Sequence, residues 1–398
     1  MERLQALTYE LKRNTFSLTQ SAELPRKNYV LATDIEGPLF LGDFIAEAMD
    51  ARLGPKNRTE NSPRYGQIMY QETWDWFTQE TVPSRRGNGH VPRDAMSTSQ
   101  EGTDTIFTLP LLLAENSNMA YLEELTLNSQ TTPGADILIK ELSRDGINTF
   151  GITTAPQEPY RKLVAQRKFV DPRQVIGSPF PIEDARMILQ QTGRWDIEIT
   201  IVRNYLEESY QIIDTFAQER VGLSPEGREV LRKRIKLFHE NEIGISYDPQ
   251  FKKRRGVPPT ILGQIIESTG MVGDRAKAAI AKTALITSGT RVATLITMGD
   301  GANDAVMLKE APISIGLNGA DAARAAKIAV VTDDMKNLLP LFEIILSGEK
   351  DIDSIVAQTR IKAGSHAIVT RGGDGISTDI INEHRKMKRT LRGQNVTY

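Results

Sequence analysis

The chain has 398 residues, a length typical of about two or three domains. Its 49 Lys and Arg residues nearly balance 51 Asp and Glu residues, so the net charge of −2 gives no electrostatic reason to expect nucleic acid or an anionic membrane as partner. The absence of Cys excludes disulfides, a thiolate nucleophile and Cys-ligated metals. The four His residues are scattered, so a metal site would have to use carboxylates and carbonyls, which suit Mg²⁺.

The sequence also lacks the usual signals of a membrane or exported protein. No apolar run approaches the roughly 20 residues that a membrane helix needs. The first residues, Met1 to Leu4, do not resemble a signal peptide. We therefore expect a soluble, cytoplasmic protein, whose oligomeric state the sequence leaves open.

Short apolar runs alternate with helical patterns along the chain. Such runs, each ending in a polar turn, predict parallel strands at residues 29–33, 148–152, 293–298, 312–316 and 328–331. Helical patterns lie between them at residues 135–144, 274–288, 303–309 and 320–327. This alternation predicts an α/β fold with a doubly wound, mostly parallel sheet of the Rossmann-like type.

The spacing of the strands is uneven and indicates insertions beyond the carboxyl edge of the sheet. We expect a core made of residues 1–43, 140–175 and 257–350. Two helical insertions are expected at 44–139 and 176–256, and a helical C-terminal tail at 351–398. The end of this tail is basic, which suits either a partner-binding segment or a charged, exposed helix end.

Two features of the insertions allow two interpretations each. Trp74, Trp76 and Phe77 could line a substrate pocket, although aromatic residues at this spacing are more often helix-packing core. The basic run at residues 252–255 could recruit an anionic substrate or form a solvated loop.

The first acidic motif follows the first predicted strand. Ligands of open α/β sheets bind beyond the carboxyl ends of the strands, so polar residues at these ends are the candidates for chemistry. Asp34 and Glu36 stand two residues apart before Gly37 and Pro38. One carboxylate could attack phosphorus while the other protonates the leaving oxygen.

The second acidic motif follows the strand at 293–298 and reads Gly299-Asp300-Gly301-Ala302-Asn303-Asp304. Its glycines let the backbone approach a ligand closely, and two acids four residues apart at a helix start can hold a hard cation. The alternative is an ordinary Asp-Gly turn with Asp304 in the first turn of a helix.

Taken in chain order, these motifs resemble those of the haloacid dehalogenase superfamily. The resemblance covers an Asp-x-Glu at the first strand, a Thr at a later strand end, a Lys that opens a helix, and the Gly-Asp-Gly-x-Asn-Asp string. It is nearest to the phosphoserine-phosphatase-like branch and to archaeal members with two helical insertions, and it implies that residues 1–43, 140–175 and 257–350 are the core of that superfamily. The usual first motif has Asp-Gly-Thr where this chain has Glu36-Gly37-Pro38, which puts in doubt the phosphate contacts of that Thr.

The resemblance implies roles for the acidic residues. Asp34 would be the nucleophile that forms an aspartyl-phosphate, and Glu36 would be the general acid and base. The metal ligands would be Asp34, Asp300, Asp304 and the backbone carbonyl of Glu36, with Mg²⁺ as the cofactor.

The resemblance also implies which residues contact phosphate. Thr153 would bind the transferring phosphoryl group, with Thr154 as the alternative. Lys277 would offset phosphate charge, with Lys282 as the weaker candidate. Asn303 would support the same pocket.

These roles predict a Mg²⁺-dependent phosphomonoester hydrolase acting on a small phosphorylated metabolite through the aspartyl-phosphate. One alternative is a phosphotransferase that passes the phosphoryl group to an alcohol. Another is a non-catalytic regulatory or assembly subunit with the same fold. The sequence does not identify the substrate.

Overall fold

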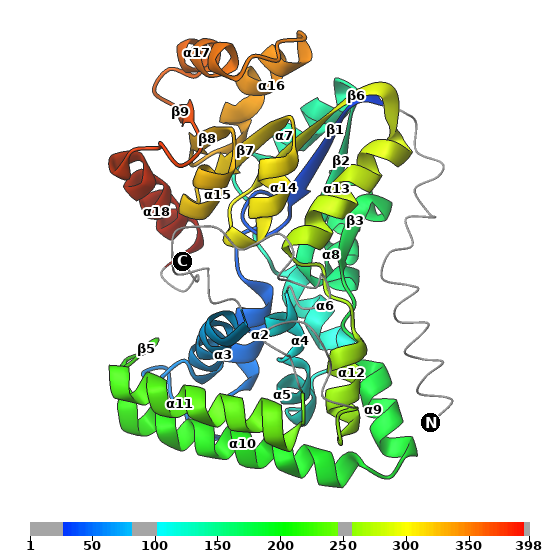
Figure 1. Cartoon of the computed structure of the whole chain (residues 1–398), viewed down its shortest axis with the longest axis vertical. Coiled ribbons are helices and arrows are strands. Elements are labelled where there is room, and N and C mark those ends of the chain that lie inside the picture. Colours follow the sequence, from blue (N-terminus) through cyan, green and yellow to red (C-terminus); the bar gives the residue numbers. More distant parts are fainter. Residues whose placement is uncertain (1–26, 82–101, 246–256, 394–398) are drawn as a thin grey trace.

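A computed structural model describes residues 27–81, 102–245 and 257–393, and the basic run at 252–255 lies outside them. A seven-stranded sheet occupies one half of the molecule, and a body of helices occupies the other (Figure 1). The strands of the sheet are β1 (Lys27–Asp34), β2 (Ile147–Pro156), β3 (Val175–Ser178), β6 (Gly289–Gly299), β7 (Ile313–Leu317), β8 (Ile328–Val331) and β9 (Ile368–Arg371). A separate antiparallel pair is formed by β4 (Ala217–Glu219) and β5 (Gly222–Leu223).

The sheet is doubly wound, as the sequence predicts. Its strand order is β3-β2-β1-β6-β7-β8-β9, and every pair is parallel except β8 with β9. The chain moves outward from β1 to β3, then returns to β6 on the opposite side of β1. The strand order therefore reverses between β1 and β6, which is where open α/β sheets bind their ligands.

Helices cover both faces of the sheet because side chains of each strand alternate between two cores. Val30 and Ala32 of β1 pack in one hydrophobic cluster with α13 (Asp274–Ser288) and α14 (Ala305–Glu310). Leu31 points the other way, into a larger cluster that includes Leu138 and Leu142 of α7 (Ala135–Arg144). Buried on both faces, these strands form near-continuous apolar runs rather than alternating ones.

The other helical elements around the sheet connect its strands, except for α18, which follows the last strand. They are α8 (Gln157–Arg167), η3 (Pro172–Gln174), η5 (Ala302–Asp304), α15 (Ala320–Ala325), η6 (Met335–Leu338), α16 (Leu339–Leu346), α17 (Ile352–Ala363) and α18 (Thr378–Arg392).

The helical body lies beyond the carboxyl ends of the parallel strands (Figure 1). It is built from α2 (Phe44–Arg52), α3 (Tyr65–Thr81), α4 (Thr103–Ile106), α5 (Leu109–Ala114), α6 (Met119–Leu127), α9 (Ile182–Gln191), α10 (Trp195–Phe216), α11 (Pro225–Leu237), the π-helical turn η4 (Phe238–Glu242) and α12 (Ile261–Ser268). All of these elements except α12 come from the two expected insertions.

The expected domain boundaries differ from the elements by a few residues. The boundary at 139/140 falls inside α7, which packs against β2 and so belongs with the sheet. The boundary at 175/176 falls inside β3. Beyond residue 257, α12 still packs against α9 of the helical body. Local patterns mark the elements well, but the body that an element joins depends on long-range packing.

The C-terminal region is helical, as expected, and it also contributes an edge strand. β9 pairs antiparallel with β8, from Ile328 opposite Arg371 to Val331 opposite Ile368. The helix α18 then packs back on the sheet through Ile381, which lies in a small hydrophobic cluster with Ala323 and Ala329. The basic helix α18 is therefore fixed against the core.

No helix in the part of the chain that the structure describes is both long enough and apolar enough to cross a membrane.

Aromatic side chains join the two insertions inside the helical body. Trp76 and Phe77 of α3 are buried, which favours the packing interpretation for these two residues. The ring of Trp76 stacks on that of His239 with 5.3 Å between centroids and 7° between planes, and Phe107 lies 4.4 Å from the same imidazole. Burial, aided by the nearby Arg234, lowers the pKa of His239 from 6.5 to about 3.

This buried imidazole makes stability depend on pH. The folded protein keeps His239 neutral, whereas the unfolded chain binds a proton below about pH 6.5. The contribution of the neutral His239 to the free energy of unfolding is thus fully present above about pH 6.5. It is lost as the pH falls toward 3, because the unfolded chain then gains a proton that the folded protein does not bind. We expect wild type to lose about 2 kcal/mol more unfolding free energy between pH 7 and pH 5 than His239→Phe, measured by urea denaturation. His366→Phe at an exposed site should behave like wild type, and an equal loss in His239→Phe would contradict the assignment.

Candidate active site

The two acidic motifs meet because β1 and β6 are parallel neighbours. Thr33 pairs with Met298, so both strands end at the same level of the sheet. Asp34 is the last residue of β1, and Asp300 follows the last residue of β6. Parallel strands thereby bring two residues 266 positions apart in the sequence to one edge.

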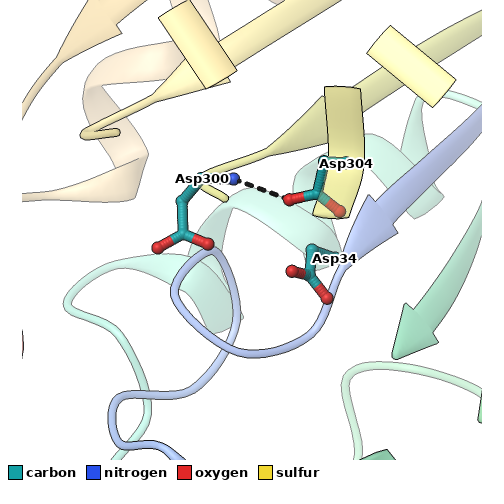
Figure 2. Close-up of side chains that lie close together, drawn as sticks. All are labelled: Asp34, Asp300 and Asp304. Carbon is teal, nitrogen blue, oxygen red and sulfur yellow. Dashed lines mark hydrogen bonds between the residues drawn. The ribbon is translucent and has the colours of Figure 1, made fainter. Parts of the chain in front are cut away.

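Three carboxylates gather at this edge (Figure 2). Asp34, Asp300 and Asp304 are all buried, and one oxygen from each lies within 4.8 Å of the others. Asp304 is held by its own loop, since its Oδ2 accepts hydrogen bonds from the backbone N–H groups of Asp300 and Gly301, each at 3.1 Å. The string Gly299 to Asp304 is therefore not an ordinary turn, because it aims two acids at the end of β1.

Lys277 neutralises part of this negative charge. It lies in the first turn of α13, fully buried, with its Nζ 3.0 Å from Asp34 Oδ1 and 2.8 Å from Asp304 Oδ1. Burial opposes the charged form, but the two carboxylates outweigh it and raise the pKa of Lys277 above its usual value. The weaker candidate, Lys282, is exposed and pairs with Glu310 at 2.6 Å. Of the two lysines, the structure brings only Lys277 to the acids.

Asp34 has a pKa raised well above its usual value. Burial is the main cause, followed by the nearby charge of Asp304, and Lys277 opposes both. Its Oδ1 accepts a hydrogen bond from the backbone N–H of Ile35 at 2.8 Å and faces Lys277 at 3.0 Å. These contacts fix the orientation of the carboxylate at the strand end.

Glu36 lies beside the cluster and is held by partners of its own. Its Oε1 accepts hydrogen bonds from the backbone N–H of Phe44 at 2.9 Å and from the Tyr160 hydroxyl at 2.8 Å. Burial, and then the charge of Asp43, raise the pKa of Glu36 to about 7. A carboxyl with this pKa can both give and take a proton near neutral pH.

The two candidate threonines have different surroundings. β2 runs on to Pro156, so Thr153 is still within the strand, fully buried, and its hydroxyl accepts from the N–H of Ala155 at 3.0 Å. Thr154 lines the cavity, and its Oγ1 accepts a hydrogen bond from Asn303 Nδ2 at 3.3 Å. Because neighbouring side chains of a strand point to opposite faces, Thr154 faces the cavity whereas Thr153 is not among the residues that line it.

Two glycines allow the loops to approach one another. Gly37 has φ +103°, and a Cβ there would lie 2.5 Å from the carboxylate carbon of Asp300. A Cβ on Gly319 would lie 1.8 Å from the carbonyl oxygen of Asp300. Larger residues at either position would displace Asp300.

The C-terminal helix reaches the same carboxylate, which the sequence did not predict. Asp300 Oδ2 lies 3.1 Å from Lys388 Nζ and 2.9 Å from Arg392 Nη1, and Arg392 also donates to the carbonyl of Gly42. Burial alone would raise the pKa of Asp300, but Lys388 and Arg392 hold it below the usual value. Asp300 and Lys388 are 88 positions apart in the sequence, which explains why local patterns gave no sign of this contact.

These residues surround a cavity of about 370 Å³ between the sheet edge and the helical body. Its lining includes Asp34, Glu36, Asp300 and Asn303 from the core, and Trp74 from α3. Of the three aromatic residues singled out in the first insertion, Trp74 alone faces this cavity among the described lining residues. The cavity can admit a small polar molecule next to the acids.

The donor set suits a hard divalent cation. Asp34, Asp300 and Asp304 offer carboxylate oxygens, which Mg²⁺ and similar ions prefer, and these atoms are close enough to share one ion. Among the described residues, the side-chain oxygens that lie close together come from these three Asp residues and not from Glu36. The expected ligand atom of Glu36 is its backbone carbonyl oxygen. The identity of the metal remains a prediction.

The sequence matches no family model and no curated protein. The structure resembles the solved structure of gene product AF1437 from Archaeoglobus fulgidus, with a TM-score of 0.63 and 16% sequence identity. The match covers 92% of this chain and 98% of that chain. The two chains share a fold. At this identity the likeness concerns the fold alone, including the helical body and the C-terminal region.

Lys277 should be essential for the stability of the acid cluster. Its loss leaves buried carboxylates without a compensating charge, so we expect Lys277→Met to lower the free energy of unfolding by about 3 kcal/mol. Urea denaturation at pH 7 in the presence of chelator measures this. Lys282→Met, at an exposed ion pair, should change it by less than about 0.5 kcal/mol. Equal effects of the two substitutions would contradict the role of Lys277.

Proposed function

We propose that this protein is a metal-dependent phosphomonoester hydrolase that acts through an aspartyl-phosphate on Asp34. The observation that carries the proposal is the convergence of Asp34, Lys277, Asp300 and Asp304 in one buried cluster at the strand-order reversal. These are the residues that the resemblance to the haloacid dehalogenase superfamily assigns to nucleophile, phosphate-charge compensation and metal binding. The proposed substrate is a small phosphorylated metabolite.

The first step would be attack of Asp34 on phosphorus. Among the described residues, the polar contacts of the Asp34 carboxylate with Ile35 and Lys277 both use Oδ1, so we assign the attack to Oδ2. The Oδ2–P bond forms as the P–O bond to the alcohol breaks, and Glu36 gives its proton to the departing oxygen. Thr154 and Asn303, joined by a hydrogen bond, would contact the phosphoryl oxygens.

The second step would return the enzyme to its starting state. A water molecule attacks phosphorus, Glu36 takes a proton from it, and the bond between phosphorus and Asp34 breaks. Glu36 is suited to both steps because Tyr160 and the backbone of Phe44 keep its carboxyl in place.

A bound divalent cation would supply charge neutralisation, which lets a carboxylate approach an anionic phosphate. Asp34, Asp300, Asp304 and the carbonyl of Glu36 are the residues that would hold it. Mg²⁺ is the ion we propose, since the available donors are oxygen atoms.

The nucleophile can be tested with a generic aryl phosphate. We expect Asp34→Asn to lower kcat roughly 1,000-fold or more, because an amide cannot form the acyl phosphate. Phosphate release and product phenol should be measured together, with thermal unfolding as a check that the variant folds. Asp136→Asn, on the exposed face of α7, is the matched control and should retain wild-type turnover. Undiminished turnover in Asp34→Asn would remove the nucleophile assignment, and phosphoryl transfer to added alcohol would favour the phosphotransferase alternative.

The metal can be tested by removal and replacement. We expect EDTA to lower turnover by about 100-fold or more, equivalent to about 3 kcal/mol in the barrier, and excess Mg²⁺ to restore it. Dialysed enzyme without chelator serves as the reference. Full activity in EDTA would refute the metal requirement.

A further inference from the structure

One face of α18 carries the positive charge of the cavity. Of the described residues that line the cavity, the basic ones are Arg385, Lys388 and Arg392, all from this helix. Their spacing of three and four residues places them on one side of a helix. In Figure 1 this helix lies against the edge of the sheet. The described acidic residues of the lining are Asp34, Glu36, Asp43, Asp104, Asp274, Asp300 and Asp321.

Two of the three basic side chains are engaged with Asp300. Arg392 is 8% exposed and bridges Asp300 Oδ2 to the carbonyl of Gly42. Lys388 is 11% exposed and contacts both the carboxylate and the backbone carbonyl of Asp300, each at 3.1 Å. These two residues therefore position an acid at the inner end of the cavity.

Arg385 differs from them in its surroundings. Its side chain is exposed, and its recorded hydrogen bond is a long one, 3.5 Å from Nη1 to Asn382 Oδ1 on the same helix. It lies seven positions before Arg392 on the helix, which is about 10 Å along the helix axis. The exposed guanidinium thus lies toward the outer end of the cavity, and most of its N–H donors have no partner among the described residues.

The remaining lining suits an organic group between these two ends. Ile45 and Trp74 offer apolar surface in the same cavity. A guanidinium presents five N–H donors in a planar fork, which matches the paired oxygens of a carboxylate or a phosphate. A ligand with one anionic group at Asp34 and a second at Arg385 would satisfy both ends.

We propose that Arg385 binds a second anionic group on the substrate. The substrate class would be a phosphomonoester that also carries a carboxylate or a second phosphate, separated from the reacting phosphorus by several bonds. This inference rests on the proposed function, because it takes the reacting phosphate to lie at Asp34. Arg385 would then be a specificity-determining residue, while Lys388 and Arg392 position Asp300.

Two aryl phosphates that differ in one charge test this inference. In 4-carboxyphenyl phosphate a carboxylate lies opposite the phosphate, and in 4-carbamoylphenyl phosphate a neutral amide of the same shape replaces it. The ratio of their kcat/KM values is measured for wild type, Arg385→Gln and the control Lys386→Gln. Lys386 is exposed on the same helix but does not line the cavity. Binding of both esters to Asp34→Asn, with and without Arg385→Gln, is measured by calorimetry.

We expect wild type to favour the carboxylate ester about fivefold, which corresponds to about 1 kcal/mol for a partly solvated ion pair. Arg385→Gln should reduce this ratio to about one, and Lys386→Gln should keep it. A wild-type ratio below about two, or the same ratio in Arg385→Gln as in wild type, would overturn the anion site.

The two proposals fail in different ways. Hydrolysis of both esters with no preference, and equal binding or no detectable binding of either to Asp34→Asn, would overturn the anion site and leave the hydrolase. If neither ester is hydrolysed but Asp34→Asn binds the carboxylate ester preferentially and Arg385→Gln removes that preference, the hydrolase fails. The anion site stands in that case.

Discussion

The site depends on the buried ion pairs that the ammonium group of Lys277 forms with Asp34 and Asp304. Carboxylates within 4.8 Å of one another repel strongly when water is excluded, and Asp34 and Asp304 both face the same Nζ atom. The repulsion would otherwise drive the loops after β1 and β6 apart. On the far side of the cluster, Lys388 and Arg392 offset the negative charge of Asp300. Cations from two helices thus flank the acids and offset part of the repulsion between them.

The topology explains why these charges can meet at all. The reversal of strand order between β1 and β6 opens a crevice at the carboxyl ends of the strands, and both acidic loops border it. α13 starts at the same edge, which places Lys277 in its first turn behind the carboxylates. The helical body closes the crevice from the other side and turns it into a cavity. Glycines at 37 and 319 let the loops come within contact distance.

Sequence patterns predicted the core elements well and the site in part. The apolar runs at 328–331 and the helical patterns at 135–144 and 274–288 match β8, α7 and α13 residue for residue. Local patterns left Thr153 and Thr154 both open, because β2 continues four residues past the predicted end and the pleat of the strand decides which hydroxyl faces the cavity. Trp74 and Trp76 show the same limit, since one faces the cavity and the other packs in the helical body.

Local sequence patterns determined the strands and the acidic turns, because hydrophobic periodicity and glycine placement are local properties of the chain. They also gave the residue types that the proposed phosphoryl site would need. The part played by the C-terminal helix has no such local signature. A basic stretch looks alike whether water or an acid surrounds it, and Asp300 lies 88 residues from Lys388. Packing of Ile381 against Ala323 and Ala329 brings that helix back to the sheet and makes its cations part of the cavity. Contacts of this kind depend on how distant elements pack, so they emerge when the chain has folded.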